Sequence, residues 1–251
     1  MSYRLLDKGI GYNPSRVHRA LYRVYGRVVR KVRSTEFIGS LLFGFRPVLH
    51  GGLCSEYWDW TTVVLKRALQ KYCSSDTSLL DLGTGPTGVL AIFCALKLRC
   101  KNVCACDYLA ELLYIAETNA RRCQVNVRFV RSDLFADISE RFDIIVFKPP
   151  YVDGALGKKL GILSEALSEK RFSGGKGGCE TIARFLSEAP LHLSEGGIAI
   201  LGVNHYHVSR AQLNRLILHS DLVVKERIQS LFLQSSAYIL QKIQLPGSQQ
   251  K

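Results

Sequence analysis

A glycine-rich segment directly behind a short apolar run is the first feature that could carry chemistry. Residues 80–88 read Leu-Asp-Leu-Gly-Thr-Gly-Pro-Thr-Gly, so the glycines have G-x-G-x-x-G spacing and Asp81 precedes them. Glycines permit a tight turn and let a ligand approach the backbone closely. A carboxylate here would repel a pyrophosphate but would accept hydrogen bonds from an ammonium group. The motif therefore favours S-adenosylmethionine over a dinucleotide, at the carboxyl end of a strand.

Two further acids follow the next two apolar runs. Asp107 ends the run that begins at Asn102, and an acid at that position is suited to accept from both hydroxyls of a ribose. Asp133 lies in Ser-Asp-Leu after the third run, where it could accept from an adenine amino group. The alternatives are a helix N-cap at Asp107 and an ordinary turn at Asp133. We predict ribose binding by Asp107, whereas Asp133 taken alone favours the turn.

The fourth apolar run ends in Phe147-Lys148-Pro149-Pro150-Tyr151. Two prolines stiffen a turn because their φ is fixed, and they leave its carbonyl groups facing outward. Tyr151 adds a flat face on which a planar substrate group could stack. Such a turn is common by itself, but it becomes specific at the tip of a fourth strand that follows the three other motifs.

The elements that hold these residues are indicated by apolar runs that alternate with amphipathic segments. Strands are predicted at 78–82, 102–107, 125–130, 142–147, 197–203, 222–226 and 237–243, and helices at 63–72, 87–98, 110–123, 180–193 and 209–219. This alternation implies right-handed crossovers and a mainly parallel sheet with helices on both faces. The short polar connection between the last two strands predicts an antiparallel hairpin at the edge. We therefore expect a Rossmann-like α/β fold with seven strands, mostly parallel, and an antiparallel edge strand.

Positive charge is concentrated near the amino terminus. The formal net charge is +13, and residues 1–46 hold ten basic residues against two acids, which is +8 of that total. A helix is predicted over 14–33, and one of its faces carries a stripe of arginines. These are Arg16, Arg19, Arg23, Arg27 and Arg30. The alternatives are a solvated face, a phosphate-binding face for nucleic acid and an organelle-targeting segment. We predict a basic helical extension over 1–50 and one domain over 51–251.

The remaining features bear on the compartment and on metal sites. The chain has eight cysteines and no amino-terminal apolar run of signal-peptide type, so we expect reduced thiols and a cytoplasmic or organellar location. It has no stretch of about 18 apolar residues, so we expect no membrane span. Cys100, Cys104 and Cys106 do not have zinc-site spacing, and no metal is predicted. His205 and His207 are predicted to lie at the surface.

The order of the motifs resembles the class I S-adenosylmethionine-dependent methyltransferases. Asp-Leu-Gly-Thr-Gly, an acid after the second strand, Ser-Asp after the third and Pro-Pro-Tyr after the fourth are similar to the amino-methylating branch with an (Asn/Asp)-Pro-Pro-(Tyr/Phe) motif. That branch includes HemK-type release-factor glutamine methyltransferases and enzymes that methylate exocyclic amines of nucleic-acid bases. Residues 172–180, which read Phe-Ser-Gly-Gly-Lys-Gly-Gly-Cys-Glu, also look HemK-like. The resemblance covers roughly residues 77–243.

The resemblance implies a role for each matching residue. The implied cofactor-binding residues are Asp81, Gly83, Thr84, Gly85, Asp107, Tyr108, Asp133 and Leu134. The implied catalytic segment is Lys148, Pro149, Pro150 and Tyr151. Asp81 and its glycines would bind the methionine end of the cofactor, Asp107 the ribose, and Asp133 would lie beside the adenine. Tyr151 would stack on the substrate while the Pro149 carbonyl accepts from the target amine.

Lys148 departs from the family, which has Asn or Asp at this position. The Asn oxygen accepts a hydrogen bond from the target –NH2, whereas a lysine ammonium can only donate. Three alternatives follow: Lys148 binds a carboxylate or phosphate on a different substrate, it acts as a base with a lowered pKa after desolvation, or methyl transfer is lost and the fold is kept as a scaffold.

The expected function is S-adenosylmethionine-dependent methylation of an RNA base or of a protein nitrogen in a translation factor or ribosomal protein. RNA, a ribonucleoprotein or a protein substrate are the expected partners, and the basic extension is expected to bind RNA. The alternatives are an inactive RNA-binding or ribosome-assembly factor with the same fold and a methyltransferase for a small molecule. In an active enzyme, most of the acceleration would come from orientation of the target nitrogen.

Overall fold

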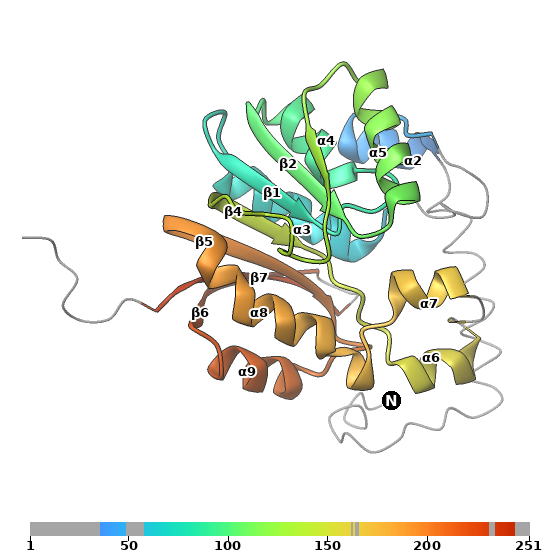
Figure 1. Ribbon diagram of the computed structural model, residues 1–251, viewed down its shortest axis with the longest axis vertical. Helices are drawn as coiled ribbons and strands as arrows, with labels where there is room; N and C mark the ends of the chain where they lie inside the picture. Colours follow the sequence, from blue (N-terminus) through green and yellow to red (C-terminus); the bar gives the residue numbers. More distant parts are fainter. Residues whose placement is uncertain (1–35, 49–57, 162, 164–165, 231–233, 244–251) are drawn as a thin grey trace, which may run out of the picture.

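Seven strands form a single sheet in the order β3-β2-β1-β4-β5-β7-β6 (Figure 1). The computed structural model describes residues 36–48, 58–161, 163, 166–230 and 234–243, so the predicted helix at 14–33 and its arginine stripe lie outside the described residues. The strands are β1 (Ser78–Leu82), β2 (Asn102–Asp107), β3 (Arg128–Arg131), β4 (Phe142–Phe147), β5 (Leu193–Asn204), β6 (Leu222–Gln229) and β7 (Ser235–Lys242). The predicted fold class is confirmed.

The strand order reverses direction between β1 and β4. The first five strands run parallel, and β7 is antiparallel to both of its neighbours, β5 and β6. The chain moves outward from β1 through β2 to β3 and then returns to place β4 on the other side of β1. Such a reversal of strand order is where open α/β sheets bind ligands, at the carboxyl ends of the strands.

Helices cover both faces of the sheet, as the alternating pattern predicts (Figure 1). One face is covered by α2 (Glu36–Phe43), α3 (Trp60–Tyr72), α4 (Val89–Lys97) and α5 (Ala110–Arg122), and the other by α8 (Glu180–His192) and α9 (Arg210–Leu218). Between β4 and α8 the chain forms α6 (Gly154–Leu160), α7 (Ala166–Phe172) and the 3-10 turn η2 (Lys176–Gly178). Among the residues described, no helix is long and apolar enough to cross a membrane.

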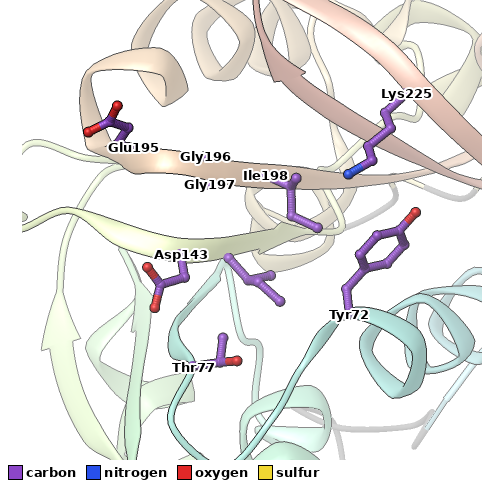
Figure 2. Close-up of a pocket in the computed structure, with 9 residues that line it drawn as sticks. Tyr72, Thr77, Asp143, Glu195, Gly196, Gly197, Ile198 and Lys225 are labelled. Atoms are coloured by element: carbon purple, nitrogen blue, oxygen red, sulfur yellow. The ribbon is translucent and has the colours of Figure 1, made fainter. Parts of the chain in front are cut away.

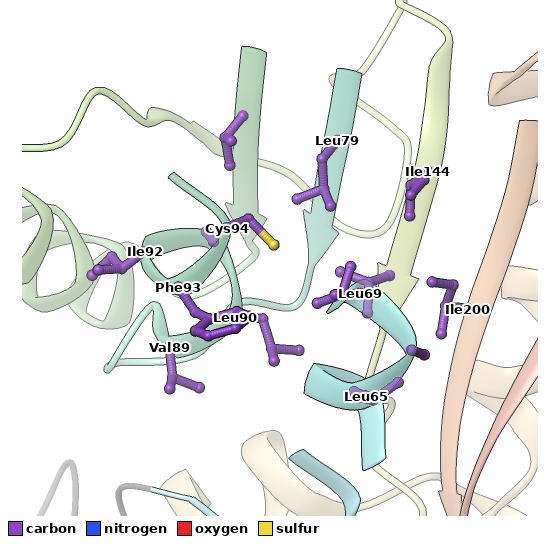
Figure 3. Close-up of a cluster of buried hydrophobic side chains, with 14 of the residues drawn as sticks. Leu65, Leu69, Leu79, Val89, Leu90, Ile92, Phe93, Cys94, Ile144 and Ile200 are labelled. Atoms are coloured by element: carbon purple, nitrogen blue, oxygen red, sulfur yellow. The ribbon is translucent and has the colours of Figure 1, made fainter. Parts of the chain in front are cut away.

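The core is divided by the sheet into two apolar clusters. Alternate residues of a strand point to opposite faces, so Ile144 of β4 packs with α3 and α4 while Ile145 packs with α8. Figure 3 shows the first cluster, in which Leu65 and Leu69 of α3 face Ile144 and Ile200. Burial on both faces makes the central strands rigid, so they can hold the residues at their ends.

Two shifted boundaries and two unpredicted helices have local reasons. α3 begins three residues earlier, because the Asp59 carboxylate accepts from the Thr62 N–H at 2.7 Å and caps the helix. β3 begins at Arg128 rather than at residue 125, because the Val125 N–H donates to the Ala120 carbonyl at the end of α5. α6 and α7 are not predicted, since seven residues are too few to display a helical period.

Candidate functional site

The glycine loop after β1 wraps over a buried carboxylate. Asp81 is 3% exposed, and its Oδ2 accepts from Thr84 Oγ1 at 2.6 Å and from the Ala91 N–H at 3.1 Å. Gly85 has a φ of +64°, and a Cβ placed on it would have no atom within 4 Å. The loop thus turns through left-handed conformations that favour glycine and leaves open space beside its backbone. Asp81 anchors the loop to the first turn of α4.

Asp107 connects the ends of β1 and β2. Its Oδ2 accepts from the Gly85 N–H at 3.0 Å, and its Oδ1 accepts from the Leu109 N–H at 3.1 Å. Burial raises the pKa of this carboxyl, and the hydrogen bonds from Leu109 and Gly85 act in the opposite direction. Each carboxylate oxygen keeps a further lone pair, so Asp107 could accept from two hydroxyl groups while it holds the loop. The N-cap of α5 is Leu109, which has no side-chain cap, so the N-cap alternative for Asp107 is wrong and ribose binding stays a prediction.

The stability of the protein should depend on pH through Asp81. Burial raises the pKa of Asp81 from 3.8 to about 6. Because the folded state binds the proton more tightly, the stability contributed by this group is fully present below about pH 4 and is lost as the pH rises through 6. Relative to Asp81→Asn, the wild type is expected to lose about 2–3 kcal/mol of unfolding free energy between pH 4 and pH 7.5. Urea unfolding of both proteins at each pH measures this, and parallel pH profiles would contradict it.

Asp133, the third acid, is exposed, whereas Asp81 and Asp107 are buried. Asp133 follows β3 and forms a double ion pair with Arg184 of α8, with both N–O distances 3.2 Å. Its side chain is 62% exposed, so it lies at the surface. Leu134 is buried, has a φ of +51° and packs in the cluster beneath α8. The hydroxyl of the half-exposed Tyr108 donates to the Lys170 carbonyl of α7.

Lys148 at the end of β4 extends toward the start of α3. Its Nζ donates to Asp59 Oδ2 at 3.1 Å and to Thr62 Oγ1 at 3.3 Å. Asp59 is the N-cap of α3, so this ion pair ties the helix start to the proline turn. The charge of Lys148 also acts on Asp81, where it opposes the rise in pKa. The lysine, the glycine loop and the proline turn therefore belong to one site.

Tyr151 is held from two sides. Its hydroxyl lies 3.4 Å from Thr61 Oγ1, which is itself 3.1 Å from Ser235 Oγ at the start of β7. Its ring stacks on His207, with centroids 5.4 Å apart and planes 26° from parallel. Burial lowers the pKa of His207, which favours the neutral imidazole. His207 and His205 are half-buried, so their predicted position at the surface is wrong: the loop after β5 folds back over the site, which a two-residue spacing cannot reveal.

The glycine-rich segment 172–180 packs against the residues that follow the proline turn. The Val152 N–H donates to the Phe172 carbonyl, and the Gly174 N–H donates back to the Val152 carbonyl, both at 2.9 Å. A Cβ on Gly174 would lie 2.6 Å from the Pro150 carbonyl oxygen. Pro149 is buried and Pro150 is half-buried. Glycine is therefore required because two backbone segments run in contact, and their contact fixes the direction of the turn.

Gly178→Ala should damage the site more than Gly177→Ala does. Both glycines have positive φ, +68° and +65°, so both variants carry the same left-handed strain of about 1 kcal/mol. A Cβ on Gly178 would also lie 2.3 Å from the Tyr151 carbonyl oxygen, whereas on Gly177 it meets only the end of Gln212 at 3.4 Å. We expect Gly178→Ala to lower the free energy of unfolding by about 2–3 kcal/mol and Gly177→Ala by about 1 kcal/mol. Equal losses in urea unfolding would show that this close contact is unimportant.

One pocket lies beside the proline turn, and a second lies at the opposite edge of the sheet. A depression of about 400 Å³ is lined by His207, Asp153, Lys159 and Gln212 among others, and because His207 stacks on Tyr151 it lies beside the proline turn. A second pocket of about 210 Å³ lies among Thr77, Asp143 and Gly197, at the amino ends of the strands and thus at the opposite edge (Figure 2). The part of the chain that the structure describes has no group of three or more His, Cys, Asp or Glu side chains that could hold a metal ion.

Three contacts of the proline turn are not predicted from the sequence. Asp59, Thr61 and His207 come from segments far from the motifs and meet the turn only after folding. The spacing Asp59-x-x-Thr62 is itself a capping signal that could have placed the start of α3. The structure brings Asp81, Asp107, Lys148 and Tyr151 to one edge, while the arginine stripe lies outside the described residues.

A sheet of this order, with a glycine loop and acids at its carboxyl edge, is the architecture of class I methyltransferases. The Methyltransferase small domain family model matches residues 48–170. A relative from Methanocaldococcus jannaschii, assigned as a protein N5-glutamine methyltransferase, is 32% identical over 138 residues, which are 55% of this chain and 67% of the relative. A release factor glutamine methyltransferase from Streptococcus pneumoniae is 29% identical over 58% of this chain and 52% of its own length, so the chain spans about half of that relative.

The solved structures agree with the fold. A methyltransferase from Pyrococcus furiosus superposes with a TM-score of 0.62 over 87% of this chain and 99% of its own, at 22% identity. The chain belongs to the class I methyltransferases, in the HemK-like branch that contains the protein glutamine methyltransferases. The predicted enzyme class is thereby confirmed.

Proposed function

We propose that the protein transfers a methyl group from S-adenosylmethionine to a side-chain nitrogen of a protein of the translation apparatus. The observation that carries the proposal is the Pro149-Pro150-Tyr151 turn beside the Asp81–Asp107 edge, in a chain of this family. The substrate class is supported by the relative named for release factor glutamine methylation. An RNA target is kept as an outcome of the test, because the charge of residues 1–46 favours nucleic acid.

The residues at the edge fit this cofactor. The open space at Gly85 admits a ligand against the backbone, and Asp107 has spare acceptor capacity for ribose hydroxyls. Asp81 would act mainly by holding the loop, since its Oδ2 is occupied by Thr84 and Ala91. When bound, S-adenosylmethionine would supply an electrophilic methyl group on a sulfonium. Asp133 would have to exchange its pairing with Arg184 to contact an adenine amino group.

The proline turn would orient the target nitrogen. The Pro149 carbonyl would accept a hydrogen bond from its N–H, and the Tyr151 ring would lie against a planar group such as an amide. Tyr151 is fixed by Thr61 and His207, so little entropy is lost when the substrate binds. The 400 Å³ depression beside His207 would receive the substrate segment that flanks the target. Holding the nitrogen in line with the methyl group supplies most of the rate enhancement.

Lys148 is proposed to position the turn rather than to contact the reacting nitrogen, because its ammonium is bound by Asp59 and Thr62. Lys148→Asn should therefore lower the free energy of unfolding by about 1 kcal/mol through loss of the ion pair. The rate of methyl transfer should stay within about tenfold of wild type, because the Pro149 carbonyl and the Tyr151 ring, which would orient the target nitrogen, are kept. Urea unfolding and kcat/KM measure the two effects. A complete loss of transfer in a folded Lys148→Asn would assign the lysine a direct role.

The proposed function is tested with a labelled methyl group. Purified protein and tritiated S-adenosylmethionine are incubated with the ribosomal and soluble fractions of cells that lack the gene, and the products are treated with protease or ribonuclease. Protease-sensitive label, mapped by mass spectrometry to a side-chain nitrogen, is the expected result. Ribonuclease-sensitive label would overturn the protein substrate in favour of RNA. Binding of the cofactor without any transfer would indicate the scaffold alternative.

A further inference from the structure

Three cysteines gather on the face opposite α8, away from the proposed catalytic site. Cys73 is the C-cap of α3, Cys94 lies in α4 and Cys100 precedes β2. The Cys73 and Cys100 sulfur atoms are 2.7 Å apart, although the residues are 27 positions apart in the chain. The Cys100 thiol also donates to the Ser74 carbonyl oxygen, at 3.1 Å. The described cysteines are free thiols, so this distance is a contact between two unbonded sulfur atoms.

Contacts among the thiols shift the pKa values of the pair in opposite directions. The contact with Cys73, followed by that with Cys94, lowers the pKa of Cys100. The contact with Cys100 is the largest cause that raises the pKa of Cys73. Cys73 is half-buried and Cys100 is nearly buried, which leaves room only for a small oxidant. The thiolate is the nucleophile in thiol oxidation, so Cys100 is the attacking sulfur.

We propose that Cys73 and Cys100 form a reversible disulfide when a hydroperoxide oxidises the protein. The Cys100 thiolate attacks an oxygen of hydrogen peroxide, the O–O bond breaks, and the second oxygen leaves as hydroxide, which is protonated to water. The resulting sulfenic acid is attacked by the Cys73 sulfur, and its oxygen leaves as a second water with the Cys73 proton. The two thiols lose two electrons, which the peroxide takes up. A dithiol reductant reverses the bond by thiol–disulfide exchange.

The bond would join the end of α3 to the loop before β2. α3 packs on β5 and β7, and its first turn holds Thr61 against Tyr151 and Thr62 against Lys148. A bond at Cys73 would fix the other end of this helix. It would also close a loop of 27 residues, which reduces the entropy of the unfolded chain. The oxidised protein should therefore melt at a temperature about 5–10 °C higher.

The pairing is tested by peptide mapping of the full chain after titration with hydrogen peroxide. Free thiols are blocked, and the protein is digested with trypsin and Asp-N without reduction. Cleavage after Lys71, Lys97, Arg99 and Lys101 and before Asp76 and Asp81 separates the fragment 72–75, with Cys73, from the fragment 81–97, with Cys94. The expected product joins 72–75 to 100–101, and dithiothreitol removes it.

Variants and melting curves complete the test. Cys73→Ser and Cys100→Ser should show neither the joined fragment nor the rise in melting temperature. Cys123→Ser, which removes a half-buried thiol outside the cluster, should show both as in the wild type. A bond between Cys94 and Cys100, or oxidation of the thiols to sulfinic acids with no joined fragment, would overturn the proposal. Mapping on the wild type decides the question even where a variant fails to fold.

Discussion

Replacing Asp107 with Ala is expected to weaken S-adenosylmethionine binding by about 100-fold or more. Two charge-assisted hydrogen bonds to ribose hydroxyls would be lost, each worth about 1.5–3 kcal/mol. The Gly85 and Leu109 N–H groups would lose their acceptor as well, so the glycine loop would no longer be held to the end of β2. Isothermal titration calorimetry with the cofactor measures the change in dissociation constant.

Two further variants make the Asp107 result interpretable. Asp107→Asn keeps one acceptor oxygen and should lose less affinity than Asp107→Ala. Asp76→Ala removes an acid that is paired with Lys101, is 80% exposed and lies before β1 at the opposite edge, so it should bind the cofactor like the wild type. An unchanged affinity in a folded Asp107→Ala would remove Asp107 from the proposed ribose site.

Replacing Tyr151 with Ala is expected to lower kcat/KM for methyl transfer by about 100-fold while cofactor binding stays unchanged. The ring and its stack on His207 would be lost, so the target group would have no rigid face against which to align. Misplacement of a substrate by about 1 Å can cost 10²-fold in rate. Steady-state kinetics with the identified substrate and calorimetry with the cofactor separate the two effects.

Tyr151→Phe tests whether the ring or the hydroxyl is required. It keeps the ring and its stack and removes the hydroxyl that lies 3.4 Å from Thr61 Oγ1, so its kcat/KM should stay within a few-fold of wild type. Tyr114→Ala, at a 67% exposed aromatic residue of α5, is the matched control and should be as active as wild type. A folded Tyr151→Ala with full activity would mean that substrate positioning lies elsewhere.

The central strands are the part of the fold that could be predicted from the sequence. β1, β2 and β4 have the predicted bounds, because each is a short apolar run with an abrupt polar or glycine end. Their ends carry the motifs, so the meeting of Asp81, Asp107 and the proline turn at one edge was predictable from the parallel order of the strands. The roles of these residues in binding and catalysis remain predictions.

Features that depend on tertiary contact could not be predicted in the same way. The stack of His207 on Tyr151 needs the fold of the loop after β5, and the position of Asp133 depends on its partner Arg184 in α8. Cys73 and Cys100 approach each other only because the end of α3 packs beside the start of β2. The local sequence pattern does not indicate which residues from distant segments will meet, because these contacts depend on how whole helices and strands pack.

The place of β7 between β5 and β6 bears on when the domain can acquire its native structure during synthesis. β5 and β6 are each paired with β7 and not with one another, although β6 precedes β7 in the chain. Ser235, which is linked to Tyr151 through the Thr61 hydroxyl, also belongs to β7. A nascent chain therefore has an unfilled gap in its sheet until residue 242 has emerged from the ribosome, and the candidate site cannot be completed before that point.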